Sequence, residues 1–262
     1  MINFTAIFKK HNMEKIDSID GLDFLMDNFF EDEIILDKLF KYIYFIDVDL
    51  VIEQANKVLD EIERGNPIPV RYSQKDGAYF KNNVIRKSSP KFKNRKEAYN
   101  VLKNEVYFSS TKDRSKIRVC IDSDGNKSIK DFISKRTYHS FTNGKSTIIN
   151  SMISHIWGNT NDPLFFSLLW NIVITPLPIS FILDKQEDTI YSTTVNEKNR
   201  KFIKEFKNII KAVSILLYEP NKLMRKELLE KYPDDDVMIR AKDLIDGNKI
   251  KFLPYHTSRT NV

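Results

Sequence analysis

The stretch SHIWGNTNDPLFFSLLWNIVITPLPISFILDK, residues 154–185, decides the fold of this chain. Its interior from Pro163 to Leu183 carries no charged side chain, although 30% of the residues in the protein are charged. An uncharged run of this length matches a membrane-spanning helix. Prolines and an asparagine interrupt the run, however, and neither flank carries the Lys/Arg cluster that orients a span. We therefore expect an element of a water-soluble protein and no membrane partner.

The stretch divides into a strand, a loop, a second strand and a helix. Its parts are an apolar strand ending at Ser154 and His155, the loop WGNTNDPLFF (157–166), the strand LLWNIVITP (168–176) and the helix PISFILDKQ (178–186). The helix begins with a proline, which is well tolerated there because its missing N–H would be unpaired in any case. The order strand, histidine, loop, asparagine-bearing strand and helix is informative about function.

This order resembles the HNH, or ββα-metal, nucleases. The resemblance implies that His155 is the general base on an attacking water, that Asn171 fixes the loop or reaches the metal, and that Asp184 helps to hold Mg²⁺ or Mn²⁺. SHIWG and WNIVITP are also similar to a bacterial, restriction-like group of HNH proteins. The family usually has a metal-binding Asp or His before the base, where this chain has Ser154, and Asp162 in the loop is a substitute.

The chemistry of the residues agrees with this resemblance only in part. An imidazole titrates near neutral pH and can activate water, and carboxylate and amide oxygens are suitable ligands for a hard divalent cation. His155 and Asn171 also fit a purely structural interpretation. In it, His155 is a core histidine bonded to a backbone carbonyl, and Asn171 closes a loop.

The charge of the chain is segregated along the sequence. The net charge of +6 combines an acidic segment, 1–65, with 7 basic and 15 acidic residues, and a basic segment, 66–150, with 19 basic and 7 acidic residues. A segment with a net charge of +12 attracts polyanions. Its cations alternate with aromatic and small polar residues, a composition typical of surfaces that grip nucleic acid. A solvated basic face is the alternative.

We predict that the nucleic-acid contacts come mainly from this basic segment, with one further lysine in the HNH-like helix. The predicted nucleic-acid-binding residues are Arg71, Lys81, Arg86, Lys87, Lys91, Lys93, Arg95, Lys96 and Lys185.

The spacing of apolar residues and the composition of successive segments predict an α+β fold in four parts. Apolar residues at intervals of three and four predict an acidic helical subdomain (1–66), short β-branched and aromatic runs predict a basic β-rich region (67–147), and an HNH-like ββα element (148–190) and a helical C-terminal region (191–262) follow. Within the β-rich region, KIRVCI and KSIKDFI flank Asp124-Gly125, which predicts a β-hairpin. NRKFIKEFKNIIKAVSILLY (199–218) predicts an amphipathic helix.

The remaining features bound the class of protein. A single cysteine, Cys120, excludes an internal disulfide framework and favours the reducing cytoplasm, and the N-terminus lacks the pattern of a secretory signal. The sequence thus predicts a cytoplasmic, metal-dependent endonuclease that hydrolyses DNA, such as a restriction or phage-defence enzyme; a homodimer would suit double-strand cleavage. The alternatives are a non-catalytic nucleic-acid-binding protein with a structural His155, and a peripheral membrane protein.

Overall fold

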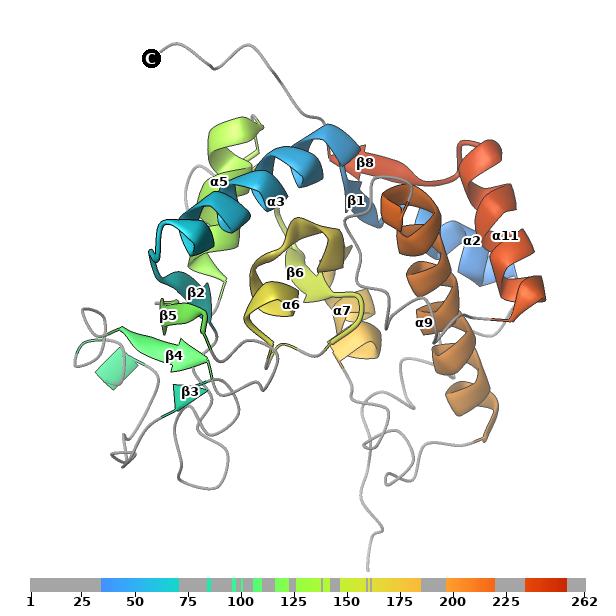
Figure 1. Cartoon of the computed structure of the whole chain (residues 1–262). Coiled ribbons are helices and arrows are strands. Elements are labelled where there is room, and N and C mark those ends of the chain that lie inside the picture. Colours follow the sequence, from blue (N-terminus) through green and yellow to red (C-terminus); the bar gives the residue numbers. More distant parts are fainter. Residues whose placement is uncertain are drawn as a thin grey trace, which may run out of the picture.

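Two four-stranded mixed sheets and the helices around them form the described part of the chain, which confirms the predicted α+β class (Figure 1). The computed structural model describes residues 34–70, 84–85, 96–97, 100, 106–109, 116–122, 126–137, 139–141, 147–158, 160, 162–184, 197–219 and 234–253.

Sheet A draws its strands from three of the four predicted parts of the chain. Its strand order is β6 (Ser151–His155), β7 (Ile172–Pro176), β1 (Tyr44–Ile46) and β8 (Lys251–Leu253). β1 is antiparallel to β7 and parallel to β8, and β6 is antiparallel to β7. Strands close to both ends of the described chain therefore meet side by side.

The prediction of continuous helix up to residue 46 is wrong for β1. Helix α2 (Ile34–Phe40) ends before it, and β1 then lies between two other strands. Phe45 and Ile46 are fully buried and belong to different core clusters, which shows that β1 is covered on both faces. A strand buried on both faces is apolar throughout, so its sequence cannot be told from a buried helix by periodicity alone.

Helical layers cover both faces of sheet A (Figure 1). One core cluster joins β1 and β7 to α2, α7 (Leu177–Asp184), α9 (Glu197–Tyr218) and α11 (Asp235–Asp246). The other joins the sheet to α3 (Val48–Glu63), α5 (Lys127–Arg136), α6 (Pro163–Ser167), the 3-10 turn η4 (Leu169–Asn171) and the end of α9. We call these the α7 face and the α3 face.

Helix α9 confirms the amphipathic pattern of the sequence. Phe206, Ile209 and Val213 are fully buried, and Phe202 and Leu216 pack against the same core. Its apolar side therefore serves the interior of the protein.

The strand–loop–strand–helix order of the decisive stretch is confirmed. β6 and β7 pair through five residues each, from Ser151 opposite Pro176 to His155 opposite Ile172, and α7 packs on β6 and β7. The loop contains more structure than the sequence predicts, because Asp162 caps α6 by accepting a hydrogen bond from the Leu164 N–H at 2.9 Å.

Sheet B lies within the basic segment. Its strand order is β2 (Ile68–Val70), β5 (Arg118–Ile121), β4 (Tyr107–Ser109) and β3 (Val84–Ile85). β2 and β5 are parallel and the other neighbours are antiparallel. β2 contacts α6 and α3, which joins sheet B to the α3 face of sheet A.

The hairpin predicted around Asp124-Gly125 is wrong, because β5 is followed by helix α5. The buried Asp122 carboxylate explains the start of this helix. It accepts hydrogen bonds from the backbone N–H groups of Lys127 and Ser128, both at 2.8 Å, and from the Ser128 hydroxyl at 2.7 Å. A carboxylate that satisfies the free N–H groups of a first turn stabilises the helix that follows.

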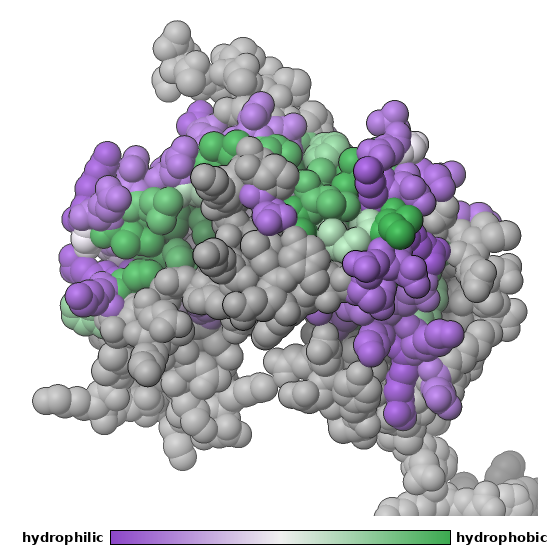
Figure 2. Space-filling model, turned by 45° about the vertical axis from the view of Figure 1, so that its right-hand side comes forward, coloured by the Kyte–Doolittle hydropathy of each residue, from purple (hydrophilic) through white to green (hydrophobic). Residues whose placement is uncertain are grey.

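In the described ranges, no helix is long and apolar enough to cross a membrane. The residues of the uncharged run from Pro163 to Leu183 instead divide among α6, η4, β7 and α7. The surface in Figure 2 is a mosaic in which purple hydrophilic side chains surround smaller green apolar areas.

Candidate functional site

The amide of Asn171 holds together the loop between β6 and β7. Asn171 is fully buried at the end of η4. Its Oδ1 accepts a hydrogen bond from the Trp157 N–H at 2.8 Å, and its Nδ2 donates to the carbonyl oxygens of Phe165 at 2.7 Å and Gly158 at 3.3 Å. One side chain thus ties the first residues of the loop to α6, as the sequence predicts for a loop-fixing asparagine.

His155 lies beside this amide, at the end of β6, and is turned into the protein. Only 7% of its surface is exposed. Its ring stacks on Phe166 with a centroid separation of 5.7 Å and an interplanar angle of 19°, and Nε2 is 3.5 Å from the Phe166 carbonyl oxygen. This is the environment of a core histidine packed against helix α6.

His155 and helix α7 belong to opposite faces of sheet A. His155 pairs with Ile172, and Ile153 pairs with Ile174; these three isoleucines belong to the core on the α3 face. Ser154 pairs with Val173, which belongs to the core of the α7 face together with the buried residues of α7. Since side chains alternate along a strand, Ser154 faces α7 and His155 does not.

Ser154 is the residue directly before His155 in β6. It is fully buried, and its Oγ is 3.0 Å from the Oγ1 of Thr175, which is also fully buried. The buried residues of α7 on this face include Ile179, Ile182 and Leu183. The interior between β6 and α7 thus contains a hydroxyl pair packed among apolar side chains.

The described residues do not fit a divalent cation. The oxygens of Asn171 and Asp162 accept backbone hydrogen bonds, and Ser154 is paired with Thr175. Across the described ranges, no group of three His, Cys, Asp or Glu side chains lies close enough to hold a metal ion. Asp184 is the last residue of α7, and its side chain lies outside the described part.

The structure therefore brings together two of the three predicted centre residues. His155 is the last residue of β6, and Asn171 directly precedes β7. The two strands are joined here by a hydrogen bond from the Ile156 N–H to the Asn171 carbonyl oxygen at 2.9 Å. Of the predicted nucleic-acid-binding residues, Lys96 is described and exposed. The others lie outside the described residues: Arg71, Lys81, Arg86, Lys87, Lys91, Lys93, Arg95 and Lys185.

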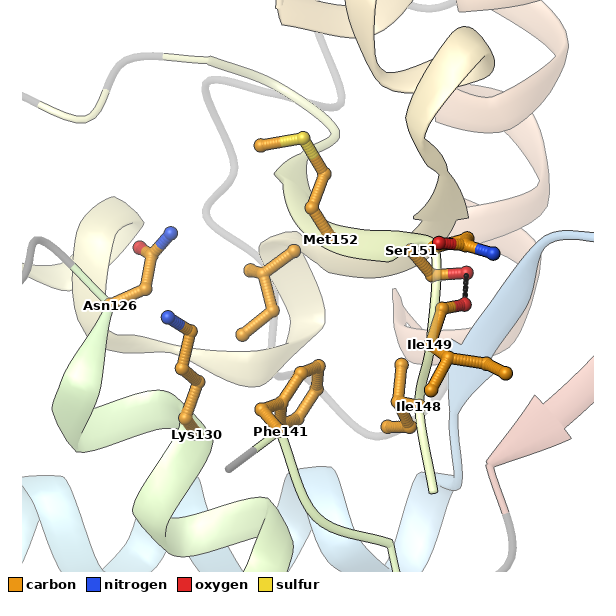
Figure 3. Close-up of a pocket in the computed structure, with 9 residues that line it drawn as sticks. Asn126, Lys130, Phe141, Ile148, Ile149, Ser151 and Met152 are labelled. Atoms are coloured by element: carbon orange, nitrogen blue, oxygen red, sulfur yellow. Dashed lines mark hydrogen bonds between the residues drawn. The ribbon is translucent and has the colours of Figure 1, made fainter. Parts of the chain in front are cut away.

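A cavity of about 370 Å³ lies at the opposite end of β6 (Figure 3). It separates α5 from the segment that leads into β6, with Asn126 and Lys130 on one side and Phe141, Ile148 and Met152 around it. Sequence reasoning missed it, because Asn126 and Lys130 were assigned to a hairpin. The one local signal for this helix is Asn126 at its N-cap position, a residue type that is common there.

The loop beside His155 is also fixed to helix α9. The Trp157 Nε1–H donates to the Ser214 Oγ at 3.1 Å, and the Lys211 ammonium lies 5.7 Å from the centre of the Trp157 ring. Bonds from Asn171 and from α9 thus hold this loop from two sides. These contacts give the start of the loop a structural role.

Comparisons with known proteins place the chain in a family. Neither the curated proteins nor the solved structures gave a match. One family model matches residues 46–251, which run from the last residue of β1 to the first residue of β8 and include all of sheet B and strands β6 and β7 of sheet A. The chain therefore belongs to the family described as "Uncharacterised protein PM1201".

Proposed function

We propose that the chain binds nucleic acid without cleaving it, and that His155 and Asn171 have structural roles. The structural roles are supported by the hydrogen bonds and the burial of the two side chains. The Asn171 amide bonds three backbone groups of the loop, and His155 is stacked on Phe166 with little exposed surface. A general base must reach the proton that it abstracts, and a buried ring on the α3 face does not present itself to a phosphodiester.

The charge distribution supports nucleic acid as the partner. The segment 66–150 has a net charge of +12, and the described Lys96, Lys116, Arg118 and Lys135 are exposed within it. Some cations of the segment are neutralised by acids, as in the ion pair between Arg136 and Glu53 at 2.5 Å. The excess of cations remains large, and cations that neutralise phosphates bind nucleic acid through the release of counterions.

A metal-dependent endonuclease is the second candidate. The order of β6, β7 and α7, with Asn171 bonded to the intervening loop, favours it. In this case Mg²⁺ or Mn²⁺ would require a ligand such as Asp184, with His155 released from Phe166 to act on water. DNA would be the substrate.

Incubation with plasmid DNA separates the two candidates. The purified protein, His155→Ala and the control His139→Ala are incubated with plasmid in Mg²⁺ or Mn²⁺, and binding is measured in parallel at several salt concentrations. His139 is a suitable control because it lies outside the loop, with Nδ1 3.3 Å from the Thr147 hydroxyl. We expect no cleavage product from any of the three proteins.

The three proteins should bind DNA with equal affinity. The logarithm of this affinity should fall linearly with the logarithm of the salt concentration. His155→Ala should lower the melting temperature, because it removes a buried ring. Cleavage by the parent and by His139→Ala, but not by a folded His155→Ala, would instead establish the endonuclease. The absence of any salt-dependent binding would contradict both candidates.

A further inference from the structure

An aromatic ring projects from the interior of sheet B into solvent. Phe108 is the middle residue of β4, and 52% of its surface is exposed. β4 lies between β5 and β3, so its exposure is not that of an edge strand (Figure 1). An exposed Phe side chain forgoes part of the hydrophobic stabilisation that its burial would supply.

The strand register places an arginine opposite this phenylalanine. Phe108 is directly opposite Arg118 in the antiparallel pair of β4 and β5. Residues opposite each other lie on the same face of a sheet, with Cα atoms about 4.5–5.5 Å apart. Arg118 is exposed, and Cys120, two residues further along, is on the same face. We call this surface the Phe108 face.

The other face of sheet B is the buried one. Ile68, Val70, Val119 and Ile121 alternate with the residues of the Phe108 face and are at most 5% exposed. Sheet B thus packs one face into the protein and exposes Phe108 and Arg118 on the other, where Pro69 and Cys120 are half-buried. An open face is normal for an antiparallel sheet, but such a face usually carries polar side chains.

The Phe108 face carries positive charge. The Nη1 of Arg118 donates to the Gly65 carbonyl oxygen at 2.7 Å, which uses one of the five N–H donors of a guanidinium and orients the rest. Lys116, just before β5, is also exposed. The four strands of sheet B contain no Asp or Glu. The face therefore combines an exposed aromatic ring with an oriented cation. The carboxylate of Asp122, which directly follows β5, is buried and accepts hydrogen bonds from the first turn of α5.

We propose that the Phe108 face binds single-stranded nucleic acid, with a base stacked on Phe108 and a neighbouring phosphate held by Arg118. This inference rests on the proposed function and specifies its ligand. Single strands offer the π-faces of their bases to aromatic side chains on open sheets, whereas the bases of a duplex are already stacked. Every base has such a face, so we expect little sequence preference.

Fluorescence anisotropy with labelled oligonucleotides tests the proposal on the full chain. The probes are a single-stranded DNA of mixed sequence, the RNA of the same sequence and the corresponding DNA duplex. The variants are Phe108→Ala, Phe108→Tyr, Arg118→Gln and the matched control Phe252→Ala. Phe252 is a suitable control because it is 37% exposed on β8 of sheet A, next to Lys251.

The single-stranded probes should bind more tightly than the duplex. Phe108→Ala should weaken their binding about 5- to 150-fold, the range for loss of one base–aromatic stack. Phe108→Tyr and Phe252→Ala should leave it unchanged. Arg118→Gln should weaken binding and reduce the slope of log affinity against log salt by about 0.7, the value for one phosphate contact on a single strand. The two single-stranded probes decide between DNA and RNA.

Two results would overturn the proposal in distinguishable ways. Salt-dependent binding that Phe108→Ala leaves unchanged would refute the role of the Phe108 face and retain the proposed nucleic-acid binding. No binding of any probe by the folded parent would refute both. Unfolding curves of all variants establish that they are folded, which is expected because Phe108 and Phe252 are exposed.

Discussion

The hydroxyl oxygens of Ser154 and Thr175 lie 3.0 Å apart between strands β6 and β7, on the face of sheet A that α7 covers. Both residues are fully buried. Each hydroxyl is thereby satisfied without a ligand from outside the protein. The pair links β6 to β7 beneath α7, so a neutral contact joins the strands at this point.

Replacing Thr175 by valine should destabilise the protein by about 1–3 kcal/mol, because the buried Ser154 hydroxyl loses its partner. Denaturant unfolding measures the change, and Thr175→Ser, which keeps the hydroxyl but removes a methyl group, is the control. Combining Thr175→Val with Ser154→Ala should restore part of the loss, because no polar group is then left unpaired. A double variant no more stable than Thr175→Val would contradict the pair.

Replacing Asn171 by aspartate should be costly, although the two side chains have the same shape. A carboxylate can still accept from the Trp157 N–H, but it cannot donate to the Phe165 and Gly158 carbonyl oxygens and would carry a buried charge. We expect a loss of about 3 kcal/mol or more in the free energy of unfolding. The loss should become smaller as the pH is lowered and the new carboxyl group is protonated. A loss independent of pH would contradict this account.

Replacing Asp122 by alanine should unfold the start of α5. The change removes the acceptor of three hydrogen bonds from Lys127 and Ser128, and capping groups contribute about 0.5–2 kcal/mol. Hydrogen exchange of the Lys127 and Ser128 amides measures the effect locally. Asp131→Ala, which removes the exposed ion pair of Lys127 and Asp131, is the control and should have little effect.

Cys120 should be an unreactive thiol. Burial and the nearby charge of Asp122 raise its pKa from the ordinary value of 9.0 to about 11. At pH 8 the thiolate fraction, and with it the rate of alkylation by iodoacetamide, should be about 100-fold below that of an unfolded chain. Asp122→Asn should increase the rate. Equal rates in native protein and in urea would contradict the raised pKa.

The same shift makes stability depend on pH. Above pH 9 the unfolded chain releases the thiol proton, while the folded protein holds it up to about pH 11. The folded state then binds more protons, so the stabilisation present below pH 9 is lost as the pH rises through this window. The free energies of unfolding of the parent and Cys120→Ser should therefore converge or cross between pH 9 and 11.

The sequence predicted those elements whose boundaries carry local signals. The prolines and the apolar run around Asn171 marked β7 and α7, and the spacing of apolar residues marked α9. Two elements depended on distant contacts and were mispredicted. β1 is defined by its neighbours β7 and β8, and α5 begins because the Asp122 side chain reaches across a turn-like sequence.

The candidate site shows the same limit. The resemblance to HNH nucleases singled out His155 and Asn171, but the sequence could not reveal which face of the sheet each residue occupies. That depends on the register of β6 against β7, in which His155 is opposite Ile172. Phe108 escaped notice for a similar reason, because the exposure of one aromatic residue is decided by the packing of a whole sheet.

The parallel pairing of β1 with β8 has a consequence for folding of the chain during its synthesis on the ribosome. Residues 44–46 emerge long before residues 251–253, by about 10–40 s at the usual ~5–20 residues per second. Both edges of β1 lack a partner until β7 emerges, and one edge still lacks a partner until β8 does; an unpaired apolar edge invites aggregation. The pairing of β8 therefore completes the sheet late in synthesis. We expect the yield of native protein to depend on the rate of synthesis and on any chaperone that shields Tyr44–Ile46.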